Sequence, residues 1–208
     1  MRDPATALPG RSPSPLRDRP RARLALLTAG LVAFGVSNAM LLLAGLGVGP
    51  WDVLHQGLSR SFGLGVGTWS ILVSFVLLLL WIPLRQRPGV GTLANAVLVG
   101  LVIDLVLGAV APPDGLAVRV VLLVGGVLLN AVATGAYIGA GLGPGPRDGL
   151  TTGLAARGHS IRVVRTSIEV VVLGLGWLLG GTVGVGTVLY ALAIGPLTHL
   201  TIPRLRLR

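Results

Sequence analysis

Residues 45–58 read GLGVGPWDVLHQGL, and residues 141–154 read GLGPGPRDGLTTGL. Nine of the 14 aligned positions are identical, and both copies contain a Gly-Pro pair with an aspartate two residues after the proline. A Gly-Val-Gly-Thr tetrapeptide at 89–92 recurs at 184–187 with almost the same spacing. The spacing predicts that the chain is an internal duplication. The glycines and prolines that define the motifs are Gly47, Gly49, Pro50, Gly89 and Gly91 in the first copy and Gly143, Gly145, Pro146, Gly184 and Gly186 in the second.

Six apolar stretches lie around these motifs, and each can cross a hydrocarbon core of about 30 Å when tilt or local thinning is allowed. Hydrophobic residues make up 52% of the 208 residues and charged residues only 12%, whereas about 25% of a soluble domain is charged. The sequence therefore predicts an all-α polytopic membrane protein with the lipid bilayer as its partner. It excludes a nucleic-acid-binding domain in spite of the net charge of +10. The six stretches are approximately 24–44, 67–84, 91–110, 117–140, 162–180 and 185–203.

The duplication also divides the chain into segments. We expect a disordered Arg- and Pro-rich cytoplasmic tail over residues 1–23, membrane repeats over 24–110 and 117–203, and a basic cytoplasmic tail over 204–208. Because each repeat contains three spans, the second copy enters the membrane from the opposite side. The predicted fold is therefore two inverted three-helix repeats, each with one additional short helix.

The distribution of arginine predicts the orientation. The chain has no lysine, and 15 of its 17 arginines lie on one side if six spans are threaded with both termini inside, which leaves only Arg60 and Arg119 outside. We therefore expect a multi-pass protein of the bacterial plasma membrane with cytoplasmic N- and C-termini. At the matched position of the two motifs, we interpret Trp51 as an interfacial anchor on the outer side and Arg147 as a positive-inside residue.

The paired Gly-x-Gly-Pro-[Trp/Arg]-Asp-x-Leu and Gly-Val-Gly-Thr motifs, with Arg165-Thr166-x-x-Glu169, resemble the YczE/YyaS/YitT family of bacterial membrane proteins. The resemblance covers about residues 24–203. It is closer to the YczE-like branch, because we expect no soluble C-terminal domain after the last span. The resemblance implies a polytopic plasma-membrane protein, and it does not imply a substrate or a reaction.

Two polar segments, 50–62 and 146–158, are too short to span the membrane. Each begins with a proline after a glycine-rich loop, which is typical of the first turn of a helix. They are either re-entrant half-helices whose N-termini face a substrate or amphipathic helices at the two membrane surfaces. Asp52 and Asp148 fall in the first turns, where a carboxylate can also satisfy free backbone N–H groups, so both alternatives stay open.

Charged residues within the apolar stretches indicate a polar pathway, because charge in a bilayer is costly and usually faces the protein interior. Arg165 precedes Glu169 by one helical turn, which predicts either a neutralising ion pair or, alternatively, a proton relay. Asp104 has no partner on its own helix, and its matched position in the second copy is His199. The candidate pathway consists of Asp148, Arg165, Glu169 and His199 at the inner mouth and Asp52 and Asp104 at the outer mouth.

Inverted repeats, broken helices and intramembrane charges are typical of secondary transporters, so we expect a small permease for a small molecule or an ion. The alternative is a non-transporting accessory protein that supports a membrane-associated assembly or biosynthetic complex. No catalytic triad, paired-carboxylate site or phosphate-binding loop is recognisable, and we expect neither enzyme activity nor a cofactor. The lack of cysteine and the presence of only three histidines argue against a dedicated metal site. Asn38 and Asn130, which lie inside two of the apolar stretches, are expected to form hydrogen bonds between helices, and the alternative is that they line a pore.

Overall fold

The computed structural model of the chain describes residues 19–207, and the regular structure in this range is entirely α-helical. The predicted apolar stretches correspond to α1, α3, α4, α5, α7 and α8, and the two polar segments correspond to α2 and α6. The eight helices in this range are α1 (Pro20–Ala44), α2 (Pro50–Phe62), α3 (Val66–Trp81), α4 (Val90–Ala109), α5 (Leu116–Gly139), α6 (Pro146–Ala155), α7 (Ile161–Leu178) and α8 (Val185–Leu205).

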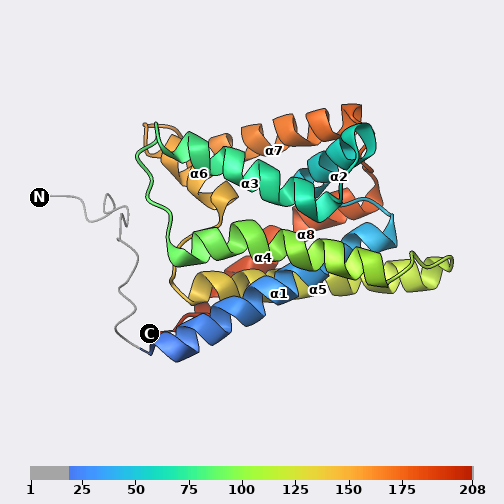
Figure 1. Ribbon diagram of the computed structural model, residues 1–208, viewed down its shortest axis with the longest axis horizontal. Coiled ribbons are helices and arrows are strands. Elements are labelled where there is room, and N and C mark those ends of the chain that lie inside the picture. The colour runs from blue at the N-terminus through green and yellow to red at the C-terminus, as the bar shows by residue number, and fades with distance from the viewer. Residues whose placement is uncertain (1–18, 208) are drawn as a thin grey trace, which may run out of the picture.

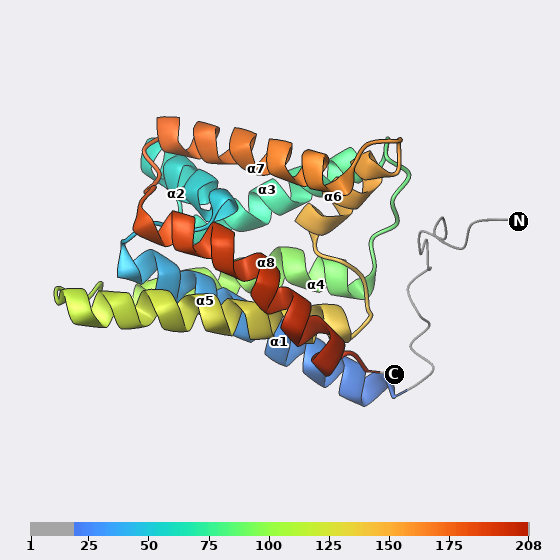
Figure 2. The same ribbon diagram turned by 180° about the vertical axis from the view of Figure 1, so that it is seen from behind.

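The helices form two layers (Figures 1 and 2). In the first layer α1 and α5 pack against each other, α4 packs on α1, and α8 packs on α5. The second layer contains α2, α3, α6 and α7, where α2 packs on α7 and α6 packs on α3. Small residues allow α1 and α5 to approach closely, since a β-carbon at Gly30 would lie 2.7 Å from the backbone nitrogen of Tyr137. Leu31 and Ile103 fill the core beside this contact.

The helices are those of a polytopic membrane protein. By length and composition, α1, α4, α5 and α8 are the four helices in the described range that can each cross a bilayer. α2 and α3 meet the same criteria only when they are taken together. They can therefore form a fifth span, which is broken by a bend of 112° between them. α3 alone has 16 residues, and α7 has 18 residues with Arg162, Arg165 and Glu169 among them.

The N-terminal tail is shorter than predicted. α1 begins at Pro20, so residues 20–23 belong to a helix and not to a disordered segment. Proline suits this first position because the first backbone N–H groups of a helix have no acceptor within the helix, so that the missing N–H of proline costs no hydrogen bond. Arg23 is buried and donates a hydrogen bond to the carbonyl oxygen of Ala140 at 2.9 Å, which holds this end of α1 against the end of α5. The predicted disorder of residues 1–18 lies outside the described residues.

The C-terminal boundary differs in the same way. α8 continues to Leu205, so Arg204 lies in its last turn and not in a separate tail. The backbone N–H of Leu207 donates a hydrogen bond to the carbonyl of Gly139 at 3.1 Å, which attaches the chain after α8 to the end of α5. Arg208 lies outside the described residues.

The two glycine-rich loops before α2 and α6 have matched backbone conformations. Gly47 and Gly143 occupy equivalent places, with positive φ angles of 107° and 123°. A β-carbon would lie 2.6 Å from the backbone nitrogen of Gly184 if it were added at Gly47, and 2.8 Å from Oγ1 of Thr92 if it were added at Gly143. Both the backbone conformation and the close approach therefore require glycine.

Each loop also binds the start of a helix from the other half of the chain. The backbone N–H of Gly91, at the start of α4, donates a hydrogen bond to the carbonyl of Leu142 at 2.9 Å. Reciprocally, the N–H of Gly186, at the start of α8, donates to the carbonyl of Leu46 at 2.8 Å. The two motif pairs seen in the sequence are thus in contact, and the contacts cross between the halves.

The arginine-rich segments lie together at one end of the molecule. The start of α1, the end of α8, the α3–α4 connection and the α6–α7 connection are all found there (Figures 1 and 2). Arg60, near the end of α2, and Arg119, in the first turn of α5, lie at the opposite end. Arginine is therefore concentrated at one end of the long axis of the molecule, as the distribution of arginine along the sequence predicts.

Candidate functional site

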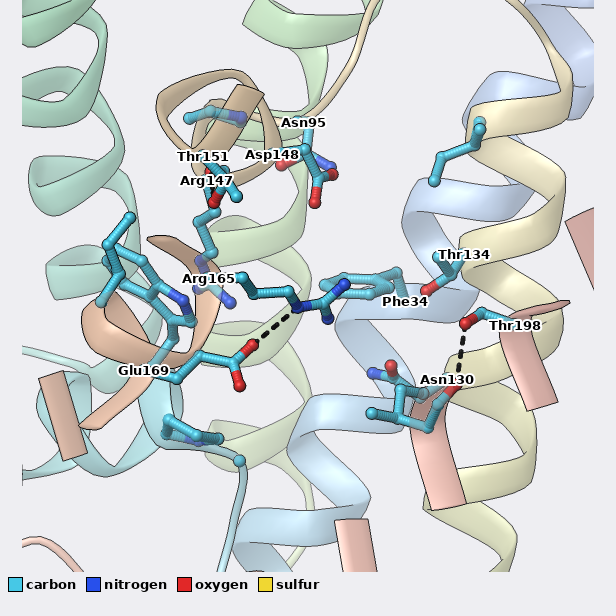
Figure 3. A pocket seen from close by; sticks show the side chains of 18 of the residues that line it. Phe34, Asn95, Asn130, Thr134, Arg147, Asp148, Thr151, Arg165, Glu169 and Thr198 are labelled. Carbon is cyan, nitrogen blue, oxygen red and sulfur yellow. Dashed lines mark hydrogen bonds and ion pairs between the residues drawn. The ribbon is translucent and has the colours of Figure 1, made fainter. Parts of the chain in front are cut away.

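A polar cavity of about 560 Å³ lies between the two helical layers, and every helix contributes to its lining. The wall formed by the first layer carries the hydrogen-bonding side chains Asn130, Thr134 and Thr198 (Figure 3). The opposite wall carries the charged side chains of α6 and α7, including Asp148 and Arg165 (Figure 3). A molecule in this cavity would therefore meet a neutral polar wall on one side and a charged wall on the other.

The N-termini of the two short helices meet at the cavity. Trp51 and Arg147 hold the second positions of α2 and α6, and the guanidinium carbon of Arg147 lies 5.1 Å from the centre of the Trp51 ring. This is a cation–π contact between residues at matched positions of the duplicated motif. Helices at opposite surfaces of a bilayer would be about 30 Å apart. The contact therefore favours two half-helices that enter the protein over two surface helices, and it replaces the predicted roles of these residues as anchors on opposite sides.

Asp52 and Asp148 both line the cavity, but their surroundings differ. Asp148 accepts a hydrogen bond from the hydroxyl of Tyr137 at 2.9 Å. Asp52 is only 3% exposed, and its closest basic group is the imidazole of His55, with 3.5 Å between Oδ1 and Nδ1. Equivalent carboxylates in the two motifs have thus acquired different partners.

Arg165 and Glu169 form an ion pair on α7, with 2.9 Å between Nε and Oε1 (Figure 3). The pair is the one that the helical spacing predicts, and its side chains are 59% and 36% exposed, so both are open to the cavity. His199 on α8 lines the same cavity. Five of the six residues of the predicted pathway therefore border one polar space.

Asp104 is the exception, because it lies outside the cavity that the other five residues line and so outside the predicted pathway. Its carboxylate accepts hydrogen bonds from the backbone N–H groups of Gly67 and Thr68 and from the hydroxyl of Thr68, all at 2.7 Å. These donors belong to the first turn of α3, whose N-cap residue Gly65 has no side chain to satisfy them. Asp104 thus caps α3 from the neighbouring helix α4, and it does not line the cavity.

A hydrogen-bonded network closes the neutral side of the cavity. Asn130 donates through Nδ2 to Oδ1 of Asn38 at 2.8 Å and to Oγ of Ser37 at 2.9 Å. The hydroxyl of Tyr190 donates to Oδ1 of Asn130 at 3.2 Å. The predicted hydrogen bonds of Asn38 and Asn130 between helices are confirmed, and Asn130 also lines the cavity. No pattern in the sequence indicated that Tyr190 or Tyr137 would join the site.

The cavity opens between α7 and α8. α3 packs along α4, but the corresponding helices α7 and α8 make little contact and diverge from their shared connection (Figure 2). A second cavity of about 330 Å³ occupies this divergence and shares Arg162, Arg165 and Glu169 with the first. These residues lie in the half of α7 that is nearer the arginine-rich end (Figure 2). The central cavity is therefore reached from that end and from the side between α7 and α8.

Comparison with known proteins identifies the family. Residues 21–203 match a family of unknown function, DUF6198. The chain is 42% identical over 173 residues to an uncharacterized protein of Haemophilus influenzae, covering 83% of this chain and 79% of that protein. It is 36% identical over 183 residues to the uncharacterized membrane protein YczE of Bacillus subtilis, covering 85% and 83% of the two chains. It is also 31% identical over 181 residues to the uncharacterized protein YyaS of the same organism, covering 84% and 89%. No solved structure matches the chain. The chain therefore belongs to the DUF6198 family, and its predicted resemblance to the YczE and YyaS proteins is confirmed over most of the length of these relatives.

Proposed function

We propose that this protein is a small membrane transporter whose substrate binds in the central cavity. In this proposal α1, α3, α4, α5, α7 and α8 cross the plasma membrane as two inverted repeats of three spans, and α2 and α6 are re-entrant half-helices. The arginine-rich end, with both chain termini, lies in the cytoplasm.

The convergence of α2 and α6 on a charged cavity carries the proposal. Two half-helices whose N-termini line the same cavity, and whose second residues are in contact, direct backbone N–H groups and first-turn side chains into one space inside the protein. Non-helical backbone at membrane depth, such as the loops before α2 and α6, is tolerated where it is buried or lines a wet cavity. An accessory protein with a packed, dry centre would not need such a cavity.

The pattern of helix contacts supports the two repeats. α1 and α5 are matched elements, and they pack on each other. α2 packs on α7 as α6 packs on α3, and α1 packs on α4 as α5 packs on α8. Together with the reciprocal hydrogen bonds of Leu46 and Leu142, these contacts are what a two-fold axis between the halves would produce.

The largest unmatched contact indicates how access could alternate. α3 and α4 are packed and joined through Asp104, while α7 and α8 are apart. In an inverted repeat the two pairs lie on opposite sides of the substrate, so a second state with α7 closed on α8 and α3 parted from α4 would open the cavity to the other side. The described state is then the one open to the cytoplasm.

Uptake by proteoliposomes tests this proposal without a prior guess at the substrate. Liposomes with the purified protein are incubated with an isotope-labelled bacterial metabolite extract under imposed proton and sodium gradients, and their contents are analysed by mass spectrometry. We expect at least one compound to accumulate in wild-type liposomes and not in liposomes with Arg147→Gln, which removes the cation at the centre of the cavity. A matched Arg85→Gln variant, changed outside the cavity, should accumulate the compound normally.

If neither accumulation nor thermal stabilisation by any compound in the extract is observed with folded protein, the transporter proposal is wrong. The accessory role is then the better interpretation.

A further inference from the structure

Asp52 and His55 form a buried pair that has no role so far in the proposed transport. His55 is 0% exposed, and neither of its ring nitrogens has a hydrogen-bond partner in the described part of the chain. Oδ1 of Asp52 also lacks a partner and faces Nδ1 of His55 at 3.5 Å, which is slightly longer than a normal hydrogen bond. Polar atoms buried without partners are destabilising, so this pair is unusual within a membrane protein.

The duplicated motif provides an internal comparison for the pair. The positions that match Asp52 and His55 are Asp148 and Thr151. Asp148 is satisfied by the hydroxyl of Tyr137, and the Thr151 hydroxyl donates to the carbonyl of Arg147 at 3.1 Å. A short helix of this kind therefore folds without a histidine, with hydrogen bonds to the side chains at both matched positions. The histidine of the first copy is not required by the fold.

The chemistry of the pair selects its ligand. Imidazole gains or loses a proton near neutral pH, and a carboxylate stabilises the protonated form. Structural zinc sites need four protein ligands and catalytic sites three, and no third His, Asp or Glu joins the pair within the described residues. Sodium and magnesium prefer oxygen ligands. In neutral imidazole the single N–H can lie on Nδ1 and point toward Oδ1 of Asp52, which leaves the pair with a charge of minus one. One further proton converts the imidazole to imidazolium, and the pair then has no net charge and needs no further ligand to neutralise it.

The pair is also placed where its charge can act on the substrate site. Asp52 lines the cavity next to Trp51, and the ring of Trp51 contacts the Arg147 guanidinium. Loss of the proton changes the net charge of the pair from zero to minus one beside this cation. Other elements around α2 contribute further groups to the same cavity: Arg165 and Glu169 from α7, Tyr190 from α8, and the neutral Ser70 and Ser74 from α3.

We infer that Asp52 and His55 bind one proton whose uptake and release is coupled to substrate binding in the central cavity. The coupling part of this inference rests on the proposed transport function, whereas the proton site itself does not. The buried pair thus supplies the ion site of the first half of the chain. The matched residues of the second half, Asp148 and Thr151, do not form a corresponding site.

Nuclear magnetic resonance of the ¹⁵N-labelled histidine side chains tests the site directly. The full chain in lipid nanodiscs contains only His55, His159 and His199, and the variants His159→Gln and His199→Gln assign their signals. We expect the His55 signals to titrate, and the titration to shift in Asp52→Asn. The signals of His159, which is exposed in the α6–α7 connection and does not line the cavity, should not respond to Asp52→Asn. A His55 that keeps one protonation state throughout the pH range in which the protein stays folded, or that titrates independently of Asp52, overturns the proton site.

Transport then separates this inference from the proposed function. If a substrate is accumulated by the wild type, His55→Gln should abolish accumulation driven by a pH gradient and retain exchange of the substrate across the membrane. Equal gradient-driven accumulation by His55→Gln would overturn the coupling while the transporter proposal stands. If His55 titrates with Asp52 but no substrate is found, the transporter proposal fails and the proton site stands.

Discussion

Asp104 shows that an acidic residue inside a membrane helix can act entirely as a structural group. Three donors of α3 converge on its carboxylate, and no cationic partner is needed, because the partial positive charge of a helix N-terminus stabilises the anion. Its position within an apolar stretch makes this residue a pathway candidate, because charge in a bilayer is costly. The cost predicts that the residue is enclosed by protein, but it does not distinguish a cap from a transport site.

Removal of this cap should lower stability. We expect Asp104→Ala to lower the free energy of unfolding by about 2–4 kcal/mol, since three hydrogen bonds to a charged acceptor are lost. Asp104→Asn should have a smaller effect, because the amide oxygen can still accept. Denaturant titration of the purified protein in mixed micelles measures the change, with Asp114→Ala in the exposed α4–α5 connection as a control expected to lie within about 0.5 kcal/mol of wild type. An Asp104→Ala protein as stable as the control would show that the cap is not needed.

The helical elements themselves were predictable because they depend on local composition. The six apolar stretches and two polar segments correspond to eight helices whose ends differ from the prediction by a few residues. The contacts between elements were less accessible. Trp51 and Arg147 look like anchors for opposite membrane surfaces when each is considered alone, and only the fold reveals that their side chains are in contact. The divergence of α7 from α8 likewise could not be predicted, because the sequences of the two halves are so similar.

The two glycine-rich loops should be equally intolerant of a side chain. We expect Gly47→Ala and Gly143→Ala each to destabilise the protein by at least about 2 kcal/mol, because alanine meets both an unfavourable positive φ angle and a close neighbour. Gly108→Ala and Gly174→Ala are matched controls within α4 and α7, where a β-carbon would meet nothing within 4 Å. These should be neutral or stabilising by up to about 1 kcal/mol. Similar losses at all four positions would argue against a special role for the loops.

At the scale of the whole molecule, the arginine-rich end and the opposite end define a direction. Because the chain has no native cysteine, single Ser→Cys variants report this direction without background. Ser61, after Arg60 at the end of α2, and Ser160, before α7, are both exposed and lie at opposite ends.

In intact cells, we expect Ser61→Cys to react with a membrane-impermeant maleimide and Ser160→Cys to react only after the cells are opened. The physical reason is the positive-inside bias of the arginines. Thr198→Cys, which lines the cavity, should behave like Ser160→Cys if the described state is open to the cytoplasm. Labelling of Ser160→Cys but not Ser61→Cys in intact cells would reverse the proposed orientation.

The reciprocal hydrogen bonds at Leu46 and Leu142 also impose an order on biogenesis. Leu142 is synthesised 51 residues after Gly91, and Gly186 is synthesised 140 residues after Leu46. Until the later residue is made, the earlier loop or helix start has backbone groups without a partner at a depth where water is scarce. A chain that ends before residue 186 therefore lacks the donor for the carbonyl of Leu46. We expect such a truncated chain to be degraded in the membrane faster than the full chain.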